Sequence, residues 1–459
     1  MTNFEKSLHK KGRRPNSVAV IGALFGDEGK GRITDELTSY FLSKYSKVIT
    51  YRDNGGANAG HTVSVNGKKI GLHQIGSGIL QEGCVVVLGK GMVIHPIDLL
   101  NEIKEVKRVF ELKELPAKLM IDEMAVLNLD THRAFEYALK NRGNVGEGMQ
   151  ATTNRGISPS YADVLYRFPL RMRDLISRDW QNKFSNHYDL YSDWTKGMGF
   201  DISKIKVNRF NTDSVSVGSK ERFLESLIKA RKELKRYVCM MYGYIKENWE
   251  SGTPFVFEKA QAVGLDYRWA VYPDTSVSNS CLDGITYSTE GVINANDISS
   301  RIGVIKSTYT SSVGKRQIPT FMEEKLAKRI RDDANEYGTT TGRPRDIAYM
   351  DLPMLKYFCK VGGIEELAFT HMDVVYDEPV KVAIEYLMDG KKSYYRPDQI
   401  HLNDMKVKYK EFKSWNGNDF KEGKISSNAQ KFMDYISAYT DTTPVMITYG
   451  PDRSDTLIV

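Results

Sequence analysis

The segment Gly22–Arg32, GALFGDEGKGR, surrounds two acids and a lysine with glycines, directly after the apolar run Val18–Ile21. Glycine clustered at such a point allows backbone amides to approach an anion at a helix start. A carboxylate and a lysine in the same loop can hold Mg²⁺, phosphate and a proton acceptor together. The spacing differs from a Walker A loop, since Leu24 stands where glycine is required and Gly31 where Ser or Thr is required. A tight turn with solvated charges is the alternative interpretation.

Two further segments pair glycines with groups that could bind anions. NGGANAGHTV (residues 54–63) places one potential acid, His61, among glycines, although a lone histidine is more often structural. TTNRGISPSYADVLYR (residues 152–167) gathers Thr152, Thr153, Arg155 and Arg167 around glycine and proline, as an anion-binding turn would. Taken singly, such arginines more often form surface ion pairs.

Three later segments add a second set of candidate ligands. TTTGRPR (339–345) puts Arg343 and Arg345 beside threonines, and planar guanidinium groups suit a carboxylate or a phosphate. THMD (370–373) leaves Asp373 after an apolar run, where a carboxylate could accept two hydrogen bonds from a guanine edge or simply cap a strand. YGPDRSD (449–455) reads as a turn around Gly450.

The elements that must position these segments follow a repeated pattern of apolar run, polar or glycine cluster, then helix. Strands are expected at 18–24, 85–88 and 253–258 and within the runs ELAFTHMD (366–373) and PVMITYGPD (444–452), with helices at 33–45, 97–109 and 221–248. This pattern predicts an α/β fold with a mostly parallel central sheet flanked by helices, with ligands at the carboxyl ends of its strands. Residues 168–220 and 380–430 are polar, aromatic and irregular, and are expected to embellish the sheet.

Composition limits the remaining choices. The chain of 459 residues is 41% hydrophobic and 27% charged, and its four separated cysteines predict reduced thiols in the cytoplasm rather than disulfides or zinc. No apolar run is long enough to span a membrane, and the net charge of +7 gives little support to a nucleic-acid partner. Residues 1–16 are expected to form a flexible basic extension, and residues 17–459 a single catalytic domain.

In this order and spacing the six segments resemble the adenylosuccinate synthetase family from about Val18 to the C-terminus, with GDEGKG, NAGHT, TGRPR and GPDR as the signature. The resemblance implies a single large domain with a P-loop-NTPase-like ligase fold, and a homodimer. It also implies a reaction in which GTP or ATP phosphorylates the 6-oxo group of a purine nucleoside monophosphate and the amine of L-aspartate displaces that phosphate.

The resemblance also assigns roles to individual residues. It makes Asp27 the base, His61 the acid and Lys30 a catalytic phosphate ligand, with Arg167 reaching the substrate phosphate of the neighbouring subunit. Mg²⁺ would be held by Asp27 and the Gly60 carbonyl. The remaining positions are substrate-nucleotide contacts at Asn58, Thr153, Gln261, Ser276 and Val313, aspartate contacts at Thr340, Thr341, Arg343 and Arg345, and donor contacts at Gly26, Glu28, Gly29, Lys30, Gly31, Asp373, Thr448 and Gly450.

Three departures from the family pattern bear on the substrates. EKAQA replaces E-G-A-Q-G and puts Lys259 beside Gln261, THMD replaces T-K-x-D with His371 in place of a lysine, and SSVGKRQIPTF loses an arginine at Ser312. Such changes resemble the phage relatives that act on dGMP for 2-aminoadenine DNA, which would place the protein in a host cytoplasm. We therefore expect dGMP as the substrate, with IMP as the alternative and a non-catalytic nucleotide-binding paralogue as a third hypothesis.

Overall fold

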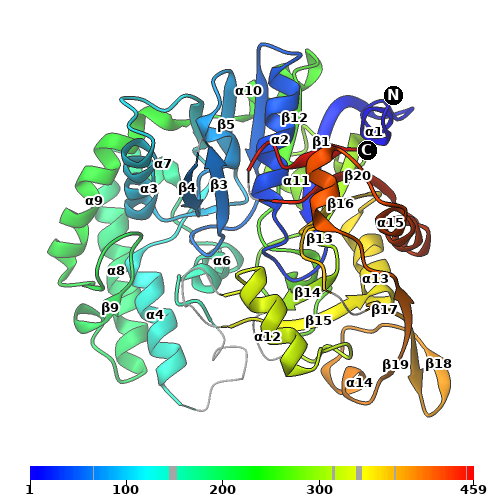
Figure 1. The fold of residues 1–459 in the computed structure, drawn as a ribbon. Coiled ribbons are helices and arrows are strands. Elements are labelled where there is room, and N and C mark those ends of the chain that lie inside the picture. The colour runs from blue at the N-terminus through cyan, green and yellow to red at the C-terminus, as the bar shows by residue number, and fades with distance from the viewer. Residues whose placement is uncertain (66, 144–151, 313–315, 338–343, 377–378, 451) are drawn as a thin grey trace.

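The fold is built on one ten-stranded sheet, shown in the computed structural model of Figure 1. The structure describes residues 1–65, 67–143, 152–312, 316–337, 344–376, 379–450 and 452–459. Every neighbouring pair of strands in this sheet is parallel except the last, β20 with β21. In sheet order the strands are β11 (Val238–Cys239), β7 (Lys118–Asp122), β5 (Cys84–Leu88), β2 (Val48–Arg52), β12 (Phe255–Glu258), β1 (Arg14–Gly22), β13 (Ile298–Lys306), β16 (Glu366–Thr370), β20 (Thr443–Thr448) and β21 (Thr456–Ile458).

Helices cover the sheet and its flanks, so that its central strands are buried on both faces. Along β1, Val18 and Val20 pack into one hydrophobic core while Ala19 and Ile21 pack into another, as the alternation of side chains along a strand requires. The helices are α1 (Asn3–Ser7), α2 (Lys30–Leu42), α3 (Pro96–Val109), α4 (Asp130–Asn141), α6 (Ile157–Tyr166), α7 (Met172–Ile176), α8 (Trp180–Gly197), α9 (Lys220–Leu234), α10 (Tyr242–Glu250), α11 (Gly284–Ser288), α12 (Glu324–Asp333), α13 (Leu352–Gly362), α14 (Gln399–Asn403) and α15 (Ser427–Thr440). The predicted α/β class with a mostly parallel, helix-flanked sheet is confirmed.

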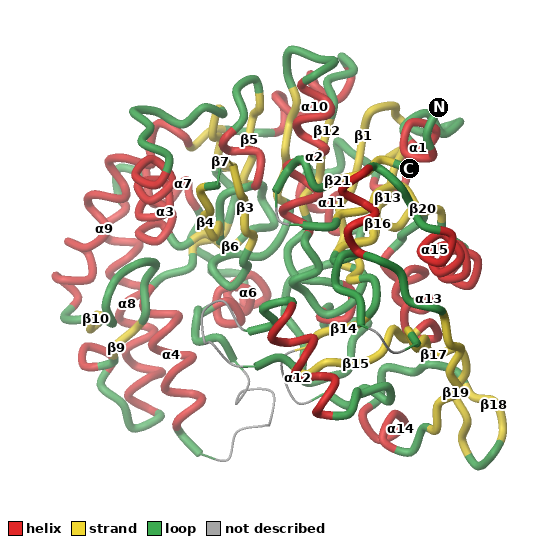
Figure 2. The backbone as a smooth tube through the Cα atoms, in the orientation of Figure 1, coloured by secondary structure: helices red, strands yellow, loops and turns green. Residues whose placement is uncertain are grey.

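A second sheet and several short strand pairs carry the remaining segments. It contains β14 (Tyr309–Ser312), β15 (Asp346–Asp351), β17 (Val380–Met388), β18 (Lys391–Ser393) and β19 (Lys406–Phe412). The pairs are β3 (His61–Val65) with β4 (Lys68–Leu72), β6 (Val93–Ile94) with β8 (Val126–Leu127), and β9 (Lys206–Val207) with β10 (Val215–Ser216). Figure 2 shows the second sheet below the ten-stranded one, beside α12 and α14.

Two expected elements differ from the structure. The helix expected at 221–248 ends at Leu234, because Val238 and Cys239 leave the helical path and pair with β7 as the edge strand of the sheet before α10 begins. The segment 168–220 is mainly helical rather than irregular, since α8 buries Phe184, Tyr188 and Tyr191 against its neighbours.

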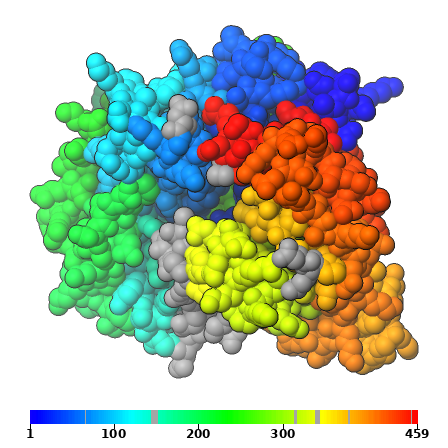
Figure 3. All heavy atoms as spheres, viewed as in Figure 1, coloured from blue at the N-terminus to red at the C-terminus, as the bar shows by residue number. Residues whose placement is uncertain are grey.

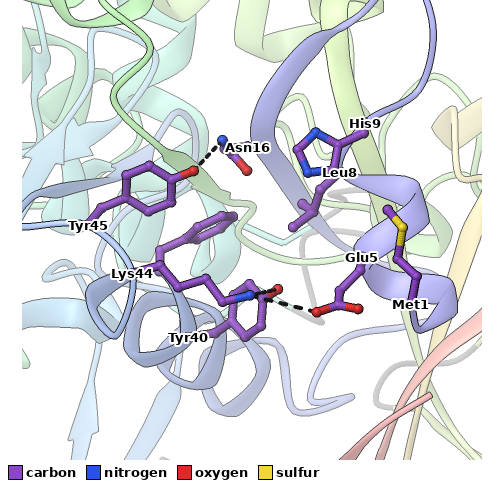
Figure 4. A pocket seen from close by; sticks show the side chains of 9 residues that line it. Met1, Glu5, Leu8, His9, Asn16, Tyr40, Lys44 and Tyr45 are labelled. Carbon is purple, nitrogen blue, oxygen red and sulfur yellow. Dashed lines mark hydrogen bonds and ion pairs between the residues drawn. The ribbon is translucent and has the colours of Figure 1, made fainter.

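The first sixteen residues also differ from the flexible extension expected of them. The side chain of Phe4 is fully buried, and Lys10 and Arg13 form ion pairs with Glu365. A small pocket separates α1 from the far end of α2, where Figure 4 shows the Lys44 ammonium between Tyr40 and Glu5. The basic residues of this segment therefore bind it to the domain instead of projecting into solvent.

Within the described residues, no helix is both long and apolar enough to cross a membrane.

Candidate active site

Several of the predicted site segments meet along one edge of the ten-stranded sheet. The strands β2, β12, β1, β13, β16 and β20 are consecutive in it. Polar segments follow β2, β1, β16 and β20 directly, and β12 is followed by Gln261. Because parallel strands bring their carboxyl ends to the same edge, segments up to four hundred residues apart in sequence become neighbours. Figure 3 shows this face of the molecule hollowed near its centre, between blue N-terminal, red C-terminal and yellow residues.

The loop after β1 has the backbone of an anion-binding turn. Gly26, Asp27 and Gly29 have φ values of 92°, 55° and 97°, and Gly29 is the N-cap of α2. Such left-handed residues turn successive amides toward one point, and the first amides of a helix have no partner within it. The Glu28 carboxylate accepts from the Gly26 amide at 2.7 Å and from the Lys30 ammonium at 2.7 Å. The Glu28 carboxylate therefore stabilises the loop from within, and the first residues of α2 face the site.

Asp27 forms an ion pair at the centre of this edge. Its side chain is 42% exposed, and one oxygen lies 2.5 Å from Nη2 of Arg345. The other terminal nitrogen of Arg345 lies 2.5 Å from Glu336, which is almost fully buried. Burial would raise the pKa of Glu336, but the charges of Lys306 and Arg345 lower it to about 2. The predicted base and one predicted aspartate ligand are thus already in contact.

His61 is buried against an acid that the sequence did not single out. Its Nδ1 is hydrogen-bonded to Glu258 at the end of β12, and the same carboxylate accepts from the Ser77 amide at 2.9 Å and the Ser77 hydroxyl at 2.5 Å. Burial would raise the pKa of Glu258, but the His61 ring and the charge of Arg52 outweigh it and lower the pKa to about 2. Burial lowers the pKa of His61, and Glu258 opposes that change. The arrangement fixes a proton on Nδ1 and leaves Nε2 for a reacting group.

The residues expected to contact the substrate nucleotide lie beyond β12. Gln261 has a φ of 59°, and its side-chain oxygen accepts from Ser278 at 2.7 Å, while its amide nitrogen is buried without a partner among the described residues. Ser276 lies next to Ser278 in the same turn, and the side-chain oxygen of Asn58 is also buried and unpartnered in the described structure. Buried polar atoms are seldom left unpaired, so these atoms are suited to a polar ligand.

Thr153 and Arg167 lie at the two ends of the α6 segment. Glu136 accepts from the Thr152 hydroxyl and from the Gly156 amide, both at 2.7 Å, and so holds the turn that exposes Thr153. Arg167 is exposed at the C-cap of α6 with a φ of 70°. It is next in sequence to the exposed Leu165 and Tyr166.

A cavity of about 800 Å³ lies at the ends of β16 and β20. Its lining includes Asp373, Gly450, Trp415, Asn416 and Asp455. The Met372 amide donates to the Thr448 carbonyl at 3.0 Å, which fixes the turn that carries Asp373. The predicted donor contacts at 373, 448 and 450 therefore come together, and the cavity offers carboxylate and amide groups to a planar ligand.

The three departures from the family pattern have structural explanations. Lys259 is fully buried and pairs with the equally buried Asp53, so its ammonium is part of the core. The partly buried His371 ring bonds to Tyr309 at 3.0 Å and is not among the residues that line the donor cavity. The Arg316 guanidinium contacts the Ser312 hydroxyl and the Asp274 carbonyl, which places a positive charge beside the position that lost one.

Four predicted residues, Val313, Thr340, Thr341 and Arg343, lie outside the described residues. In contrast, three buried acids with clear positions in the site were missed by sequence reasoning: Glu258, Glu336 and Glu136. Glu258 ends an apolar strand, as Asp373 does, and that position was the available signal. Nothing in the local sequence of the other two indicates their role.

Comparison with known proteins agrees with the geometry. The family model described as adenylosuccinate synthetase matches residues 19–457. Adenylosuccinate synthetases of Picrophilus torridus and Acetivibrio thermocellus are each 33% identical over 452 residues, covering 96% of this chain and 99% of the relative.

Two solved structures are similar. The fully ligated adenylosuccinate synthetase of Plasmodium falciparum superposes with a TM-score of 0.83 at 28% identity, covering 97% of this chain and all of that one. The succinoaminodeoxyadenylate synthetase of cyanophage S-2L, bound to dGMP and dATP, gives a TM-score of 0.60 at 15% identity over 97% of this chain and 96% of that one. At that identity the second likeness concerns the fold alone.

Proposed function

The chain belongs to the adenylosuccinate synthetase family of ligases, and from this premise we propose that it joins L-aspartate to C6 of IMP at the expense of GTP. The observation that carries the proposal is the convergence of Asp27, His61 and Arg345 on one sheet edge, between the nucleotide side at β12 and the cavity at β16 and β20. The γ-phosphoryl group passes to O6 of the purine, and the aspartate amine then attacks C6 and expels phosphate.

Asp27 would accept the N1 proton of the purine as O6 becomes nucleophilic. Its carboxylate is exposed enough to reach a ligand, whereas the neighbouring Glu28 is used internally by Gly26 and Lys30. The exposed Gly60 and the Asp27 carboxylate supply the hard oxygen atoms that Mg²⁺ prefers, so the residues fit that ion. When bound, Mg²⁺ would neutralise charge on the donor phosphates.

His61 would stabilise the phosphoryl group in transfer. With Nδ1 bonded to Glu258, the ring presents Nε2, and the ionised carboxylate favours a second proton there as negative charge develops opposite it. The amides at the start of α2 add further donors for the same phosphate.

Arg345 would bind a carboxylate of the substrate aspartate. In the structure its Nη2 is paired with Asp27. Aspartate would have to draw this nitrogen away, and the same movement would free Asp27 for its proton. Binding of the amino acid and readiness of the base are therefore linked.

The expectation of dGMP finds no support, and its alternative, IMP, is favoured. Lys259 forms an ion pair with Asp53, so it adds no net charge on the side of Gln261 proposed to face the purine. Arg316 supplies a cation next to Ser312. The relatives at 33% identity are named adenylosuccinate synthetase, while the phage enzyme is similar at 15% identity.

We further propose that the active species is a homodimer. Arg167 is exposed at the end of α6, and the neighbouring Leu165 and Tyr166 are 83% and 67% exposed. An arginine surrounded by exposed apolar side chains is suited to a protein interface, through which it could reach the substrate phosphate of a second copy.

The experiment is aspartate-dependent phosphate release with Mg²⁺, offering IMP, GMP and dGMP, each with GTP and with ATP. Turnover with IMP and GTP is expected, and Asp27→Ala should abolish it. Asp441→Ala is a matched control, since Asp441 is also an exposed aspartate at positive φ but lies at the end of α15. Normal turnover of Asp27→Ala, or turnover of dGMP alone by the native chain, would refute the proposal.

A further inference from the structure

A buried chain of polar groups connects the donor cavity to the aspartate ligand Arg345. It begins at His371, two residues before the cavity-lining Asp373, and continues through the hydroxyl of Tyr309 to Glu336 and Arg345. The Tyr309 hydroxyl lies 2.6 Å from Glu336 and 3.0 Å from Nδ1 of His371. Tyr309 begins β14, His371 follows β16, and Glu336 and Arg345 come before and after segment 338–343 in the sequence, so the chain of contacts joins distant parts of the sequence.

The protons of this chain are fixed by its chemistry. Tyrosine has one hydroxyl proton, and the charged Glu336 is the stronger acceptor, so Tyr309 donates to Glu336. Nδ1 of His371 must then carry a proton and donate to the Tyr309 oxygen. Burial and the charge of Lys306 lower the pKa of His371 to about 4, which keeps the ring neutral. In each of these hydrogen bonds the donor is therefore fixed, and the Tyr309 hydroxyl is not free to rotate.

Glu336 is the fixed point of the chain. It is 1% exposed and binds the Lys306 ammonium at 2.5 Å as well as Arg345 at 2.5 Å. The Arg345 amide also donates to the Glu336 carbonyl at 3.0 Å. Arg345 is therefore held by backbone and side chain together, while its Nη2 can bind either Asp27 or a substrate.

The donor turn is tied to the same chain through its backbone. His371 has a φ of 56°, and its carbonyl accepts from the Ser307 hydroxyl at 3.0 Å and the Val374 amide at 3.1 Å. A ligand that restricts the motion of the turn at Asp373 therefore also restricts the His371 ring. The ring in turn restricts the Tyr309 hydroxyl, which orients Glu336.

We propose that the chain from His371 through Tyr309 and Glu336 couples the two sites, so that a donor base held at Asp373 tightens aspartate at Arg345 and aspartate tightens the donor to the same degree. The inference rests on the proposed function of the two sites. His371 acts here as a positioning residue, since it is not among the residues that line the cavity and need not contact the donor base itself.

The test is calorimetric titration of L-aspartate into the full chain with IMP and Mg²⁺, with and without a non-hydrolysable GTP analogue. The native chain should bind aspartate about tenfold more tightly when the analogue is present. Tyr309→Phe and His371→Ala should reduce this ratio to about twofold or less. His371→Asn should retain it, because the Asn amide nitrogen can take the place of Nδ1 and Asn accepts a positive φ.

Tyr386→Phe is the matched control, since Tyr386 is a buried tyrosine that donates to a buried carboxylate, Asp351, outside the chain of contacts. It should keep the native ratio. A native ratio near one, or a native ratio in both Tyr309→Phe and His371→Ala, would overturn the coupling. Phosphate release by the same native preparation separates the two proposals, since turnover of IMP without coupling leaves the proposed function standing, and no turnover removes both.

Discussion

Replacing Glu258 with glutamine tests the link between the buried acid and the proposed role of His61. The substitution keeps the shape of the side chain but removes the charge that faces Nδ1 of His61 and the amide and hydroxyl of Ser77. A glutamine can also donate to Nδ1, which would shift the ring proton to Nε2 in the resting state and remove support for a second proton. The loss should therefore fall on the chemical step rather than on binding.

The magnitude follows from the surroundings of the carboxylate. The folded chain lowers the pKa of Glu258 from 4.5 to about 2, which corresponds to about 3 kcal/mol in favour of the charged form at ~1.4 kcal/mol per pKa unit. Since the folded pKa is depressed, this stability is present above pH 4.5 and is lost as the pH falls toward 2. Glu258→Gln should lower the free energy of unfolding by about 3 kcal/mol at neutral pH and flatten its pH dependence in that acidic range.

Glu258→Gln should also lower the rate of the chemical step. General acid–base groups contribute about 10²–10⁴-fold in rate, so kcat should drop by roughly 10²-fold or more while the KM for IMP changes little. The assay is aspartate-dependent phosphate release across pH, beside urea unfolding at the same pH values. Ser77→Ala is the control, because it removes one donor and leaves the charge and the Ser77 amide in place. A Glu258→Gln enzyme within fivefold of native kcat, with an unchanged acid unfolding curve, would refute the assignment.

Three further substitutions test the structure elsewhere. Lys259→Met strands the buried Asp53 carboxylate and should lower the free energy of unfolding by about 3–5 kcal/mol in urea, with partial recovery when Asp53→Asn is added. Phe4→Ala should cost about 3–5 kcal/mol by the same measurement with unchanged KM values, since the first helix packs against the domain far from the site. Gly31→Ala improves helix propensity by about 1 kcal/mol but places a methyl group 2.9 Å from His61 Cβ, so kcat should fall about tenfold or more in the phosphate-release assay.

The sequence predicts the individual segments of the site better than the contacts between those segments. Apolar runs that end in polar residues located the ends of β1, β12, β16 and β20, because burial on both faces of a parallel sheet leaves that pattern in a short window. The order of the strands within the sheet leaves no comparable pattern in a short stretch of sequence. Glu258 reaches His61 across 197 residues only because β12 lies between β1 and β2. Neither residue's neighbours in sequence contain that information.

The incorrect expectations have a related cause. Helical spacing of apolar residues continues past Leu234, yet pairing with β7 outweighs it at Val238. Lys259 was interpreted as a change to the purine site because it stands beside Gln261, but alternate residues after a strand face different surroundings, and the ammonium turns to Asp53. A charged residue that is next to a site residue in the sequence can therefore direct its side chain away from the site.

Some glycines of the first loop are explained by their own backbone conformation, and others by residues that are distant in the sequence. Gly26 and Gly29 are required by their own backbone, since their φ values favour glycine and turn the amides toward an anion. Gly31 has ordinary helical geometry, and its missing side chain is explained by His61 and Ser77, whose atoms lie 2.9 Å from where a Cβ would stand. At Gly22 the obstacle is the Gln261 carbonyl, at 2.7 Å. The left-handed backbone accounts for the first two, whereas the others are small because the His61 ring and the turn at Gln261 come close to the same loop.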